Sequence, residues 1–323
     1  MSASTTTSAS SVTVSARNGG AGSGALRTVA RLLRVEEWVK NLFAFAPALF
    51  SGQLTHQAAL GQVALVTAAL CPLASSIYIL NDVIDADRDR EHPKKRHRPV
   101  ASGRISRPLA AVIGIGLVAA GFALLAAARV PAAVVWYSVG FLLLNLAYTL
   151  YLKTKVIIDV FSIAVGYVLR VLIGGAVIGV WVTHWLILCT FLLASFLGFS
   201  KRRHELKTLG EGSGRHRPVL TLYTEAFLDR MSMLTLSMTL TCYILYTISP
   251  DTIARFGTSA LVYSSLIVMF GLFRYLFLIH VKQMGSPVEV LYHDRQITLA
   301  VILWVLYVVG IVYTWPWWRQ SLR

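Results

Sequence analysis

Residues 62–89 read QVALVTAALCPLASSIYILNDVIDADRD, an apolar run that passes directly into a cluster of carboxylates. The part up to Leu80 has the composition of a membrane-spanning helix, which needs about 20 mostly apolar residues. If the helix continues, Asn81, Asp85 and Asp89 follow at intervals of four residues and share a face, with Asp82 seven residues before Asp89. Solvated acids capping a helix would leave their mutual repulsion uncompensated, so the stretch predicts a bound divalent cation.

The composition of the whole chain places this helix in a lipid bilayer. Of the 323 residues, 56% are hydrophobic and 14% are charged, whereas charged residues make up about a quarter of a soluble domain. Thirty Lys and Arg against fifteen Asp and Glu give a formal charge of +15, which must meet anionic lipid head groups or an anionic substrate. The three cysteines are odd in number and lie in apolar runs, so no disulfide framework is expected.

The sequence predicts one all-α domain after a short tract. Residues 1–25 are rich in Ser, Thr, Ala and Gly and contain no apolar signal segment, so we expect them to be disordered. Residues 26–323 are predicted to form a polytopic transmembrane catalytic domain. Its nine candidate spans lie near residues 38–54, 62–80, 108–128, 131–151, 157–179, 184–200, 229–249, 258–280 and 297–317. The first is the weakest, because Pro47 interrupts it.

Basic residues are distributed asymmetrically between the connections. The N-terminal flank and the connections after the second and sixth spans are rich in Lys and Arg, while the opposite side has only Arg129, Arg255, Arg319 and Arg323. The positive-inside rule therefore predicts a multi-pass protein of the inner (cell) membrane, with a cytoplasmic N-terminus and an external C-terminus. Nearly all acids also fall on the inner side, which this rule does not explain, because Asp and Glu contribute little to orientation. An active site at the cytoplasmic face explains them better.

The residues around the acidic cluster indicate which ligand it binds. Magnesium prefers an oxygen shell of one or two carboxylates, water and phosphates, and the pattern NDxxDxxxD provides such oxygens. No Cys/His cluster has zinc spacing, so zinc is not expected. The next residues, HPKKRHRP at 92–99, include Lys94, Lys95 and Arg96. Cations so close to a metal are repelled unless an anion lies between them, so the two segments together predict a diphosphate held by magnesium and basic side chains.

These features resemble the UbiA superfamily of intramembrane prenyltransferases, over nearly all of the chain after the N-terminal tract. Within the superfamily, the chain is most similar to the decaprenyl-phosphate phosphoribosyltransferase branch. The residues that carry this similarity are WVKN at 38–41, the stretch 78–89, REHP at 90–93, and Lys201, Arg202, Glu205, Arg217 and Tyr223. The resemblance implies a nine-helix UbiA-type bundle with a cytoplasmic-facing site and Mg²⁺ as cofactor. It also implies transfer of 5-phosphoribose from 5-phosphoribosyl 1-diphosphate to a polyprenyl (decaprenyl) phosphate, with release of diphosphate, for the arabinan precursors of the cell wall.

The resemblance also implies roles for individual residues. Asp82, Asp85 and Asp89 are expected at the catalytic centre, with Asn81, Asp85 and Asp89 as magnesium ligands. Substrate binding is expected at Lys40, Tyr78, Lys94, Lys95, Arg96, Lys153, Lys201, Arg202 and Arg217. Lys40 and Lys153 could instead be interfacial lysines that reach the head groups, and Tyr78 could belong to an interfacial aromatic belt. No general base is expected, because the second pKa of a phosphate monoester is about 6 and the acceptor is therefore mostly a dianion at neutral pH.

One departure from the superfamily pattern separates two functions. Typical prenyltransferases are expected to have a second aspartate-rich segment after the sixth span, and here residues 200–205 read SKRRHE. Cations in place of acids favour the phosphoribosyl donor. The alternative is a UbiA-type prenyltransferase with a prenyl diphosphate donor and an aromatic or other acceptor. A transporter or a non-catalytic lipid-binding protein is disfavoured, because no internal repeat is visible and the ionisable residues lie at one face. No nucleic acid partner is expected, and a homo-oligomer is left open.

Some charged residues have no assigned role at this stage. Arg170 lies inside the fifth span and must face a cavity or a partner on another helix. Asp159 is about three helical turns away, so a direct pair between the two is not expected. Glu289, Asp294 and Arg295 could close the site or pair with the connection 200–217. Gly174 and Gly175 are expected to allow close helix packing.

Overall fold

The computed structural model describes residues 21–93, 95–209, 218–282 and 287–321, and within these ranges it contains helices and no strands. The predicted all-α class is therefore confirmed. Eight of the described helices are long and apolar enough to cross a membrane. They are Gln57–Ile84 (α3), Arg107–Ala127 (α5), Ala132–Leu150 (α6), Ile158–Val177 (α7), His184–Leu209 (α8), Glu225–Ile248 (α10), Ser264–Val281 (α12) and Arg295–Ser321 (α14).

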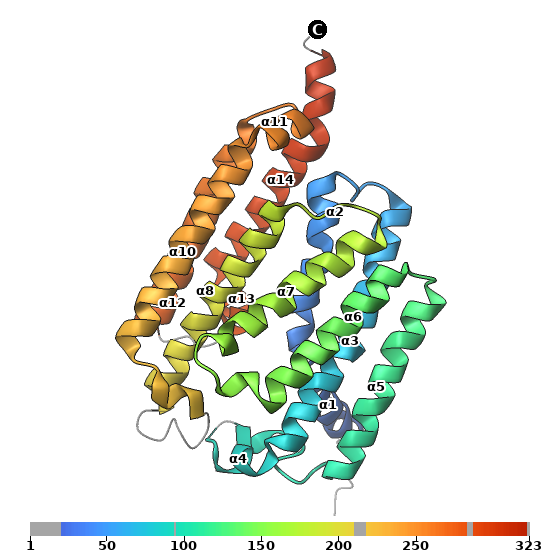
Figure 1. Ribbon diagram of the computed structural model, residues 1–323, viewed down its shortest axis with the longest axis vertical. Coiled ribbons are helices and arrows are strands. Elements are labelled where there is room, and N and C mark those ends of the chain that lie inside the picture. The colour runs from blue at the N-terminus through green and yellow to red at the C-terminus, as the bar shows by residue number, and fades with distance from the viewer. Residues whose placement is uncertain (1–20, 94, 210–217, 283–286, 322–323) are drawn as a thin grey trace, which may run out of the picture.

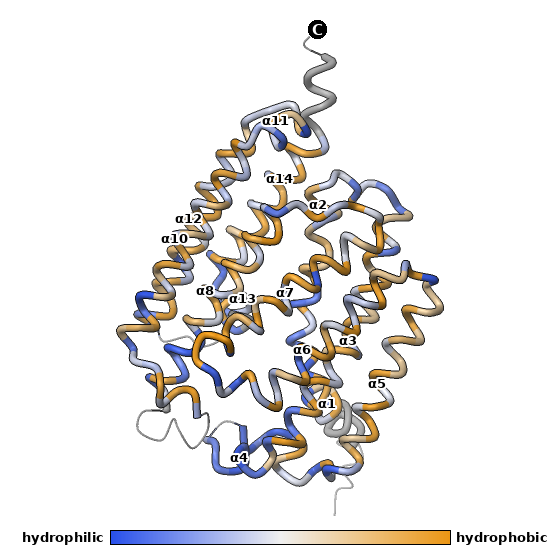
Figure 2. Tube along the Cα trace, in the orientation of Figure 1, coloured by the Kyte–Doolittle hydropathy of each residue, from blue (hydrophilic) through white to orange (hydrophobic). Residues whose placement is uncertain are grey.

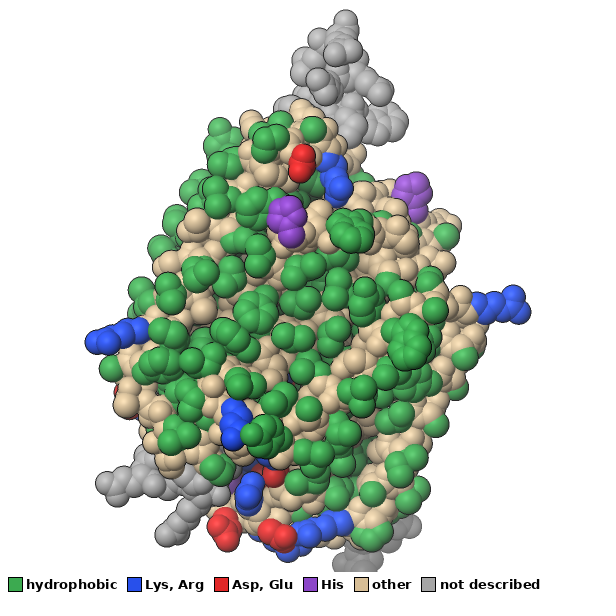
Figure 3. Space-filling model, viewed as in Figure 1, with side chains coloured by type: hydrophobic (Ala, Val, Ile, Leu, Met, Phe, Trp, Pro, Cys, Tyr) green, Lys and Arg blue, Asp and Glu red, His purple; other side chains and the backbone are tan. Residues whose placement is uncertain are grey.

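The long helices lie side by side in one bundle (Figure 1). Hydrophilic residues gather at the end of the bundle that contains the short helix α4, Ala86–Glu91 (Figure 2). Between its two ends, the face drawn in Figure 3 is mostly hydrophobic. Large apolar side chains such as Trp136 and Ile115 are 72% and 71% exposed. A surface with many such side chains would aggregate in water. The molecule is thus a membrane protein whose exposed apolar band faces lipid.

The first predicted span has a different form from the others. A 3₁₀ helix, η1 (Val35–Phe45), is followed by a short α-helix, α2 (Ala46–Ser51), which ends at Gly52 with φ 78°. Pro47 occupies the first turn of α2, where its missing N–H costs nothing. Helix α1 (Ala21–Leu33) and α4 lie at one end of the bundle and α2 lies near the other (Figure 1). Segment η1–α2 thus runs lengthwise, and the count of nine spanning helices stays a prediction.

Helix α1 begins within the tract for which the sequence predicted disorder. It starts at Ala21, whereas residues 1–20 lie outside the described residues. Its buried Leu32 packs with Ile79 of α3 and Ala110 of α5. The N-terminal segment is thereby held against the same end of α3 that contains the acidic cluster.

Segment η1 packs unusually close to α7, at Gly174. A methyl group built at this position would lie 1.9 Å from the carbonyl oxygen of Ala44 and 2.7 Å from its carbonyl carbon. Ala44 and Ala48 are completely buried in the same core. The close packing expected from Gly174 and Gly175 is therefore observed, and it fixes the distance between two walls of the cavity described below.

Gly174→Ala is expected to destabilise the protein by about 1–3 kcal/mol or more, because the clash is with backbone atoms that cannot rotate away. The measurement is the thermal unfolding midpoint of the purified protein in detergent. Gly116→Ala on α5 is a matched control, since nothing lies within 4 Å of a methyl group added there. Equal unfolding midpoints for the two variants would contradict the close approach of η1 and α7.

Candidate active site

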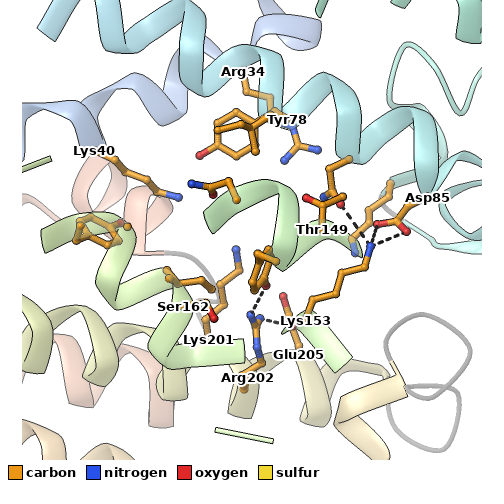
Figure 4. Close-up of a pocket in the computed structure, with 18 of the residues that line it drawn as sticks. Arg34, Lys40, Tyr78, Asp85, Thr149, Lys153, Ser162, Lys201, Arg202 and Glu205 are labelled. Atoms are coloured by element: carbon orange, nitrogen blue, oxygen red, sulfur yellow. Dashed lines mark hydrogen bonds and ion pairs between the residues drawn. The ribbon is translucent and has the colours of Figure 1, made fainter. Parts of the chain in front are cut away.

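A cavity of about 230 Å³, drawn in Figure 4, lies among α3, α6, α7 and α8, and its lining includes Arg88 of α4. Its lining has nine basic side chains and two acidic ones. Such an excess of positive charge in a partly enclosed space attracts anions. The basic residues are Arg34, Lys40, Arg88, Lys95, Arg98, Lys153, Arg170, Lys201 and Arg202, and the acidic ones are Asp85 and Glu205.

The predicted acidic cluster is divided into two parts by the structure. Helix α3 ends at Ile84, Asp85 has φ −90° and ψ 6°, and α4 begins at Ala86. The Asp85 amide still donates to the Asn81 carbonyl oxygen at 2.9 Å, so Asn81 and Asp85 remain one turn apart. Both line the cavity, whereas Asp82 and Asp89 are 1% and 4% exposed and are not among the lining residues.

Asp82 and Asp89 hold arginines rather than facing the cavity. Nη1 of Arg98 donates to Oδ1 of Asp82 at 3.1 Å and to Oδ2 of Asp89 at 2.6 Å, and Arg34 also pairs with Asp82. Burial raises the pKa of the Asp89 carboxyl above its ordinary value, although Arg98 acts in the opposite direction. Both arginines line the cavity. The two carboxylates thus orient cavity cations, and a catalytic role for either, or a metal bond from Asp89, stays a prediction.

Lys153 lies beside the acidic cluster, in the short helix η3 (Leu152–Thr154) between α6 and α7. Its Nζ is 2.8 Å from each carboxylate oxygen of Asp85 and 3.5 Å from Oδ1 of Asn81 (Figure 4). Its contacts are therefore with residues of the cavity and not those of an interfacial lysine, and its role in substrate binding stays a prediction. The connection is fixed further by Ile157, whose φ of 67° is unusual for a β-branched residue and whose amide donates to the Tyr223 hydroxyl at 2.7 Å.

The wall formed by η1 and α3 contributes Lys40 and Tyr78, both predicted substrate-binding residues. Lys40 pairs with Glu37 on its own helix, and the guanidinium carbon of Arg34 lies 4.8 Å from the centre of the Tyr78 ring. Both Lys40 and Tyr78 line the cavity. The structure thus brings together two positions that are far apart in the sequence.

Arg170 has both of the environments that the sequence left open. It lines the cavity, and its Nε donates to Oδ1 of Asn41 on η1 at 2.9 Å. Its guanidinium also lies 4.5 Å from the centre of the Phe141 ring. As expected, Arg170 does not pair with Asp159, which instead contacts Arg202 and Tyr223.

Neighbouring cations in the segment 200–205 of α8 have different roles. Lys201 lines the cavity and makes no hydrogen bond or ion pair with any residue that the structure describes. Arg202, in contrast, is 1% exposed. Its Nε donates to Asp159 at 2.6 Å, its Nη1 to Glu205 at 2.9 Å and its Nη2 to the Tyr148 hydroxyl at 3.2 Å. These contacts favour a structural role for Arg202, and its predicted role in substrate binding stays a prediction.

Arg202→Met is expected to destabilise the protein by about 3–5 kcal/mol, because Asp159 would remain buried without a counter-charge. The thermal unfolding midpoint in detergent measures this. The double variant Asp159→Leu/Arg202→Met is expected to recover much of the loss, since it removes both charges. An Arg202→Met protein as stable as wild type, with weakened donor binding, would instead support the substrate-binding role.

The other residues that were predicted to bind substrate are not all at the cavity. Lys95 lines the cavity, Arg96 is exposed and does not line it, and Lys94 and Arg217 lie outside the described residues. Sequence reasoning assigned no role in the site to several polar residues of the lining. Asn145 and Ser162 could have been found as polar residues inside predicted spans, and Arg98 as part of the basic run. The other polar lining residues without an assigned role are Arg34, Arg88, Tyr148, Thr149 and Tyr167.

Asp294 stabilises the C-terminal helices. Its Oδ2 accepts a hydrogen bond from Nη2 of Arg274 at 2.8 Å, and its Oδ1 accepts one from the amide of Ile297 at 3.0 Å. The hydrogen bond from Arg274 holds the pKa of Asp294 below its usual range. The acid therefore caps α14 and ties it to α12. Asp294, Glu289 and Arg295 are not among the residues that line the cavity.

The oxygens of the cavity fit a magnesium ion that is shared with a substrate. Among the described residues, no group of three or more His, Cys, Asp or Glu side chains gathers to hold a metal. Asn81 and Asp85 present an amide oxygen and a carboxylate to the cavity. Magnesium takes hard oxygen ligands, keeps several waters and is completed by phosphates. This donor set suits a magnesium–phosphate complex and not a cage made of protein ligands alone.

The model of the UbiA prenyltransferase family matches residues 42–293. The chain belongs to this family. It is similar to the decaprenyl-phosphate phosphoribosyltransferase of Corynebacterium glutamicum, with 26% identity over 291 residues that cover 88% of this chain and 87% of that protein. The protein of the same name from Mycobacterium tuberculosis is 27% identical over 282 residues, which cover 86% of this chain and 91% of that one.

Solved structures of UbiA proteins confirm the fold. A UbiA homolog from Archaeoglobus fulgidus bound to DMAPP and Mg²⁺ matches with a TM-score of 0.64 and 20% identity, over 88% of this chain and 99% of that one. This likeness shows that the membrane helices of the present UbiA family member are arranged as in that solved structure.

Proposed function

We propose that the protein is a magnesium-dependent polyprenyl-phosphate phosphoribosyltransferase. It moves 5-phosphoribose from 5-phosphoribosyl 1-diphosphate to a polyprenyl phosphate and releases diphosphate, at the cytoplasmic face of the cell membrane. The names of the relatives indicate decaprenyl phosphate as the acceptor. The product would serve as a precursor of cell-wall arabinan. The observation that supports this most strongly is Lys201, a cavity cation that makes no hydrogen bond or ion pair with any described residue, although Glu205 and Glu37 lie near enough to act on its charge.

The distribution of charge in the cavity favours a donor with two separate anionic groups. Lys153 and Arg88 contact Asp85, while Lys40 and Lys201 lie away from Asp85, on η1 and α8 (Figure 4). A prenyl diphosphate has one diphosphate attached to an apolar chain. Phosphoribosyl diphosphate has a 5-phosphate as well, and the acceptor adds a lipid phosphate. Nine basic side chains against two acids suit the more anionic set of substrates.

The residues that line the cavity can support the chemistry of this transfer. The C1–O bond to diphosphate breaks with its electron pair leaving on the diphosphate, and an oxygen of the acceptor phosphate forms the new bond to C1. Magnesium held by Asn81 and Asp85 would neutralise charge on the departing diphosphate. Lys153, Lys95 and Arg98 are positioned to donate to its oxygens. The acceptor phosphate needs no general base, because its second pKa is about 6.

The experiment that tests this function is mass spectrometry of lipid products. Purified protein in nanodiscs is given decaprenyl phosphate, phosphoribosyl diphosphate and magnesium, and the expected product has the mass of decaprenyl phosphoribose phosphate. A parallel reaction contains a prenyl diphosphate and an aromatic acceptor. A prenylated acceptor in the second reaction, without phosphoribosyl product in the first, would overturn the proposal in favour of the prenyltransferase alternative.

A further inference from the structure

The side chain of Lys153 binds the same oxygens that a magnesium ion would need. Its ammonium nitrogen lies 2.8 Å from Oδ1 and 2.8 Å from Oδ2 of Asp85, and 3.5 Å from Oδ1 of Asn81. The Lys153 and Asp85 side chains are only 14% and 18% exposed, so water screens their ion pair weakly. Arg88 adds a second cation, with Nη1 at 3.8 Å from Oδ1 of Asp85.

We propose that Lys153 and magnesium compete for Asp85, so that the metal binds as a complex with diphosphate and not ahead of it. This inference rests on the magnesium–diphosphate site of the proposed function. A divalent ion on the Asp85 oxygens would lie beside two positive side chains, which repel it strongly at such distances. An anion between the metal and the lysine converts this repulsion into attraction.

The location of Lys153 allows the exchange without movement of a helix. The residue lies in the three-residue helix η3, and its side chain lines the cavity together with Asp85. A lysine has a flexible stem and three donors that can change partners. When a diphosphate enters, the ammonium group can donate to phosphate oxygens and release the carboxylate to the metal.

A binding order follows from this competition. Diphosphate and magnesium each favour the binding of the other, and thermodynamic linkage requires the two effects to be equal. Departure of diphosphate would return Lys153 to Asp85 and weaken the hold on the metal. Lys153 would thus prevent magnesium from occupying the cavity without its substrate.

The test is manganese binding to the full-length protein in nanodiscs, with Mn²⁺ alone as the probe and electron paramagnetic resonance as the readout. Lys153→Met is expected to lower the Mn²⁺ dissociation constant roughly tenfold or more, because a like charge is removed from the metal site. Lys153→Arg keeps the charge and is expected to bind Mn²⁺ as weakly as wild type. With saturating magnesium, Lys153→Met is expected to retain labelled diphosphate less tightly, because a phosphate donor is lost.

Two controls make the result specific. Lys155 lies in the same connection, with its Nζ 4.5 Å from the centre of the Tyr151 ring, and does not line the cavity. We expect Lys155→Met to have wild-type Mn²⁺ affinity. In the double variant Asp85→Asn/Lys153→Met, the gain in Mn²⁺ affinity is expected to disappear. Unchanged or weaker Mn²⁺ binding by Lys153→Met overturns the proposal, and Lys153→Gln provides a second neutral variant if the first unfolds. Because no group is transferred in this experiment, its outcome is separate from the identity of the product.

Discussion

Asp85→Asn is expected to reduce kcat/KM for phosphoribosyl transfer by roughly 10²–10³-fold or more, the scale of losing one essential electrostatic group in an active site. Asp85 is the one carboxylate of the NDxxDxxxD pattern that lines the cavity among the described residues. The amide keeps the size of the side chain but lacks the charge that binds magnesium. The measurement is the initial rate at varied phosphoribosyl diphosphate and magnesium concentrations, in nanodiscs. Asn81→Ala is expected to act in the same direction, through loss of an oxygen ligand.

Asp87→Asn is the matched control for this prediction. Asp87 lies two residues further along, has a side chain that is 70% exposed, pairs with Arg90 and Arg107, and does not line the cavity. Its variant is expected to keep wild-type kinetics. EDTA should suppress activity and added magnesium should restore it. Wild-type rates for Asp85→Asn would show that this carboxylate is not part of the metal site.

The membrane spans and the cavity pair Asn81 and Asp85 could be predicted because both depend on local sequence. Spans follow from the length of apolar runs, and residues four apart stay neighbours as long as the helical hydrogen bonds continue. The backbone bond from Asp85 to Asn81 preserves that spacing, even though α3 ends at Ile84. For the first span the sequence showed only an interruption at Pro47, and it could not show that this segment forms the 3₁₀ helix η1, which packs closely against α7 at Gly174.

The partners of Asp82 and Asp89 could not be predicted from spacing. Asp82 pairs with Arg34, which is 48 residues away in the sequence, and Arg98 bridges Asp82 to Asp89. Such pairs are decided by which helices pack together, and many basic residues were available as partners. For the same reason the sequence could not show that Arg170 would contact Asn41 while still lining the cavity.

Lys201 and Arg202 show how adjacent cations on one helix take different roles. Successive residues of an α-helix point in directions about 100° apart, so the packing of α8 decides which partners each side chain meets, although both side chains line the cavity. Arg202 is enclosed by Asp159, Glu205 and Tyr148, and Lys201 is left to meet a ligand. The sequence pointed to the segment 200–205 but could not show that its two cations have different contacts.

Lys201→Ala is therefore expected to remove a charge-assisted contact to a donor phosphate, which is worth about 1.5–3 kcal/mol. This corresponds to a loss of about one to two decades in kcat/KM for phosphoribosyl diphosphate. Lys201→Asp is expected to be worse, because it places a negative charge beside the phosphate and imitates the acidic segment expected of prenyltransferases. The measurement is donor-dependent kinetics of wild type and both variants in nanodiscs.

Lys207→Ala is the control for Lys201, because Lys207 lies on the same helix, is exposed and does not line the cavity. We expect it to keep wild-type kinetics, whereas a general effect of charge at the C-terminal end of α8 would lower the rate for both lysine variants. Prenyl diphosphate provides the complementary comparison. If Lys201 serves a prenyl donor, phosphoribosyl diphosphate will not compete with it. Donor dependence that is unchanged in both Lys201 variants would remove this lysine from the donor site.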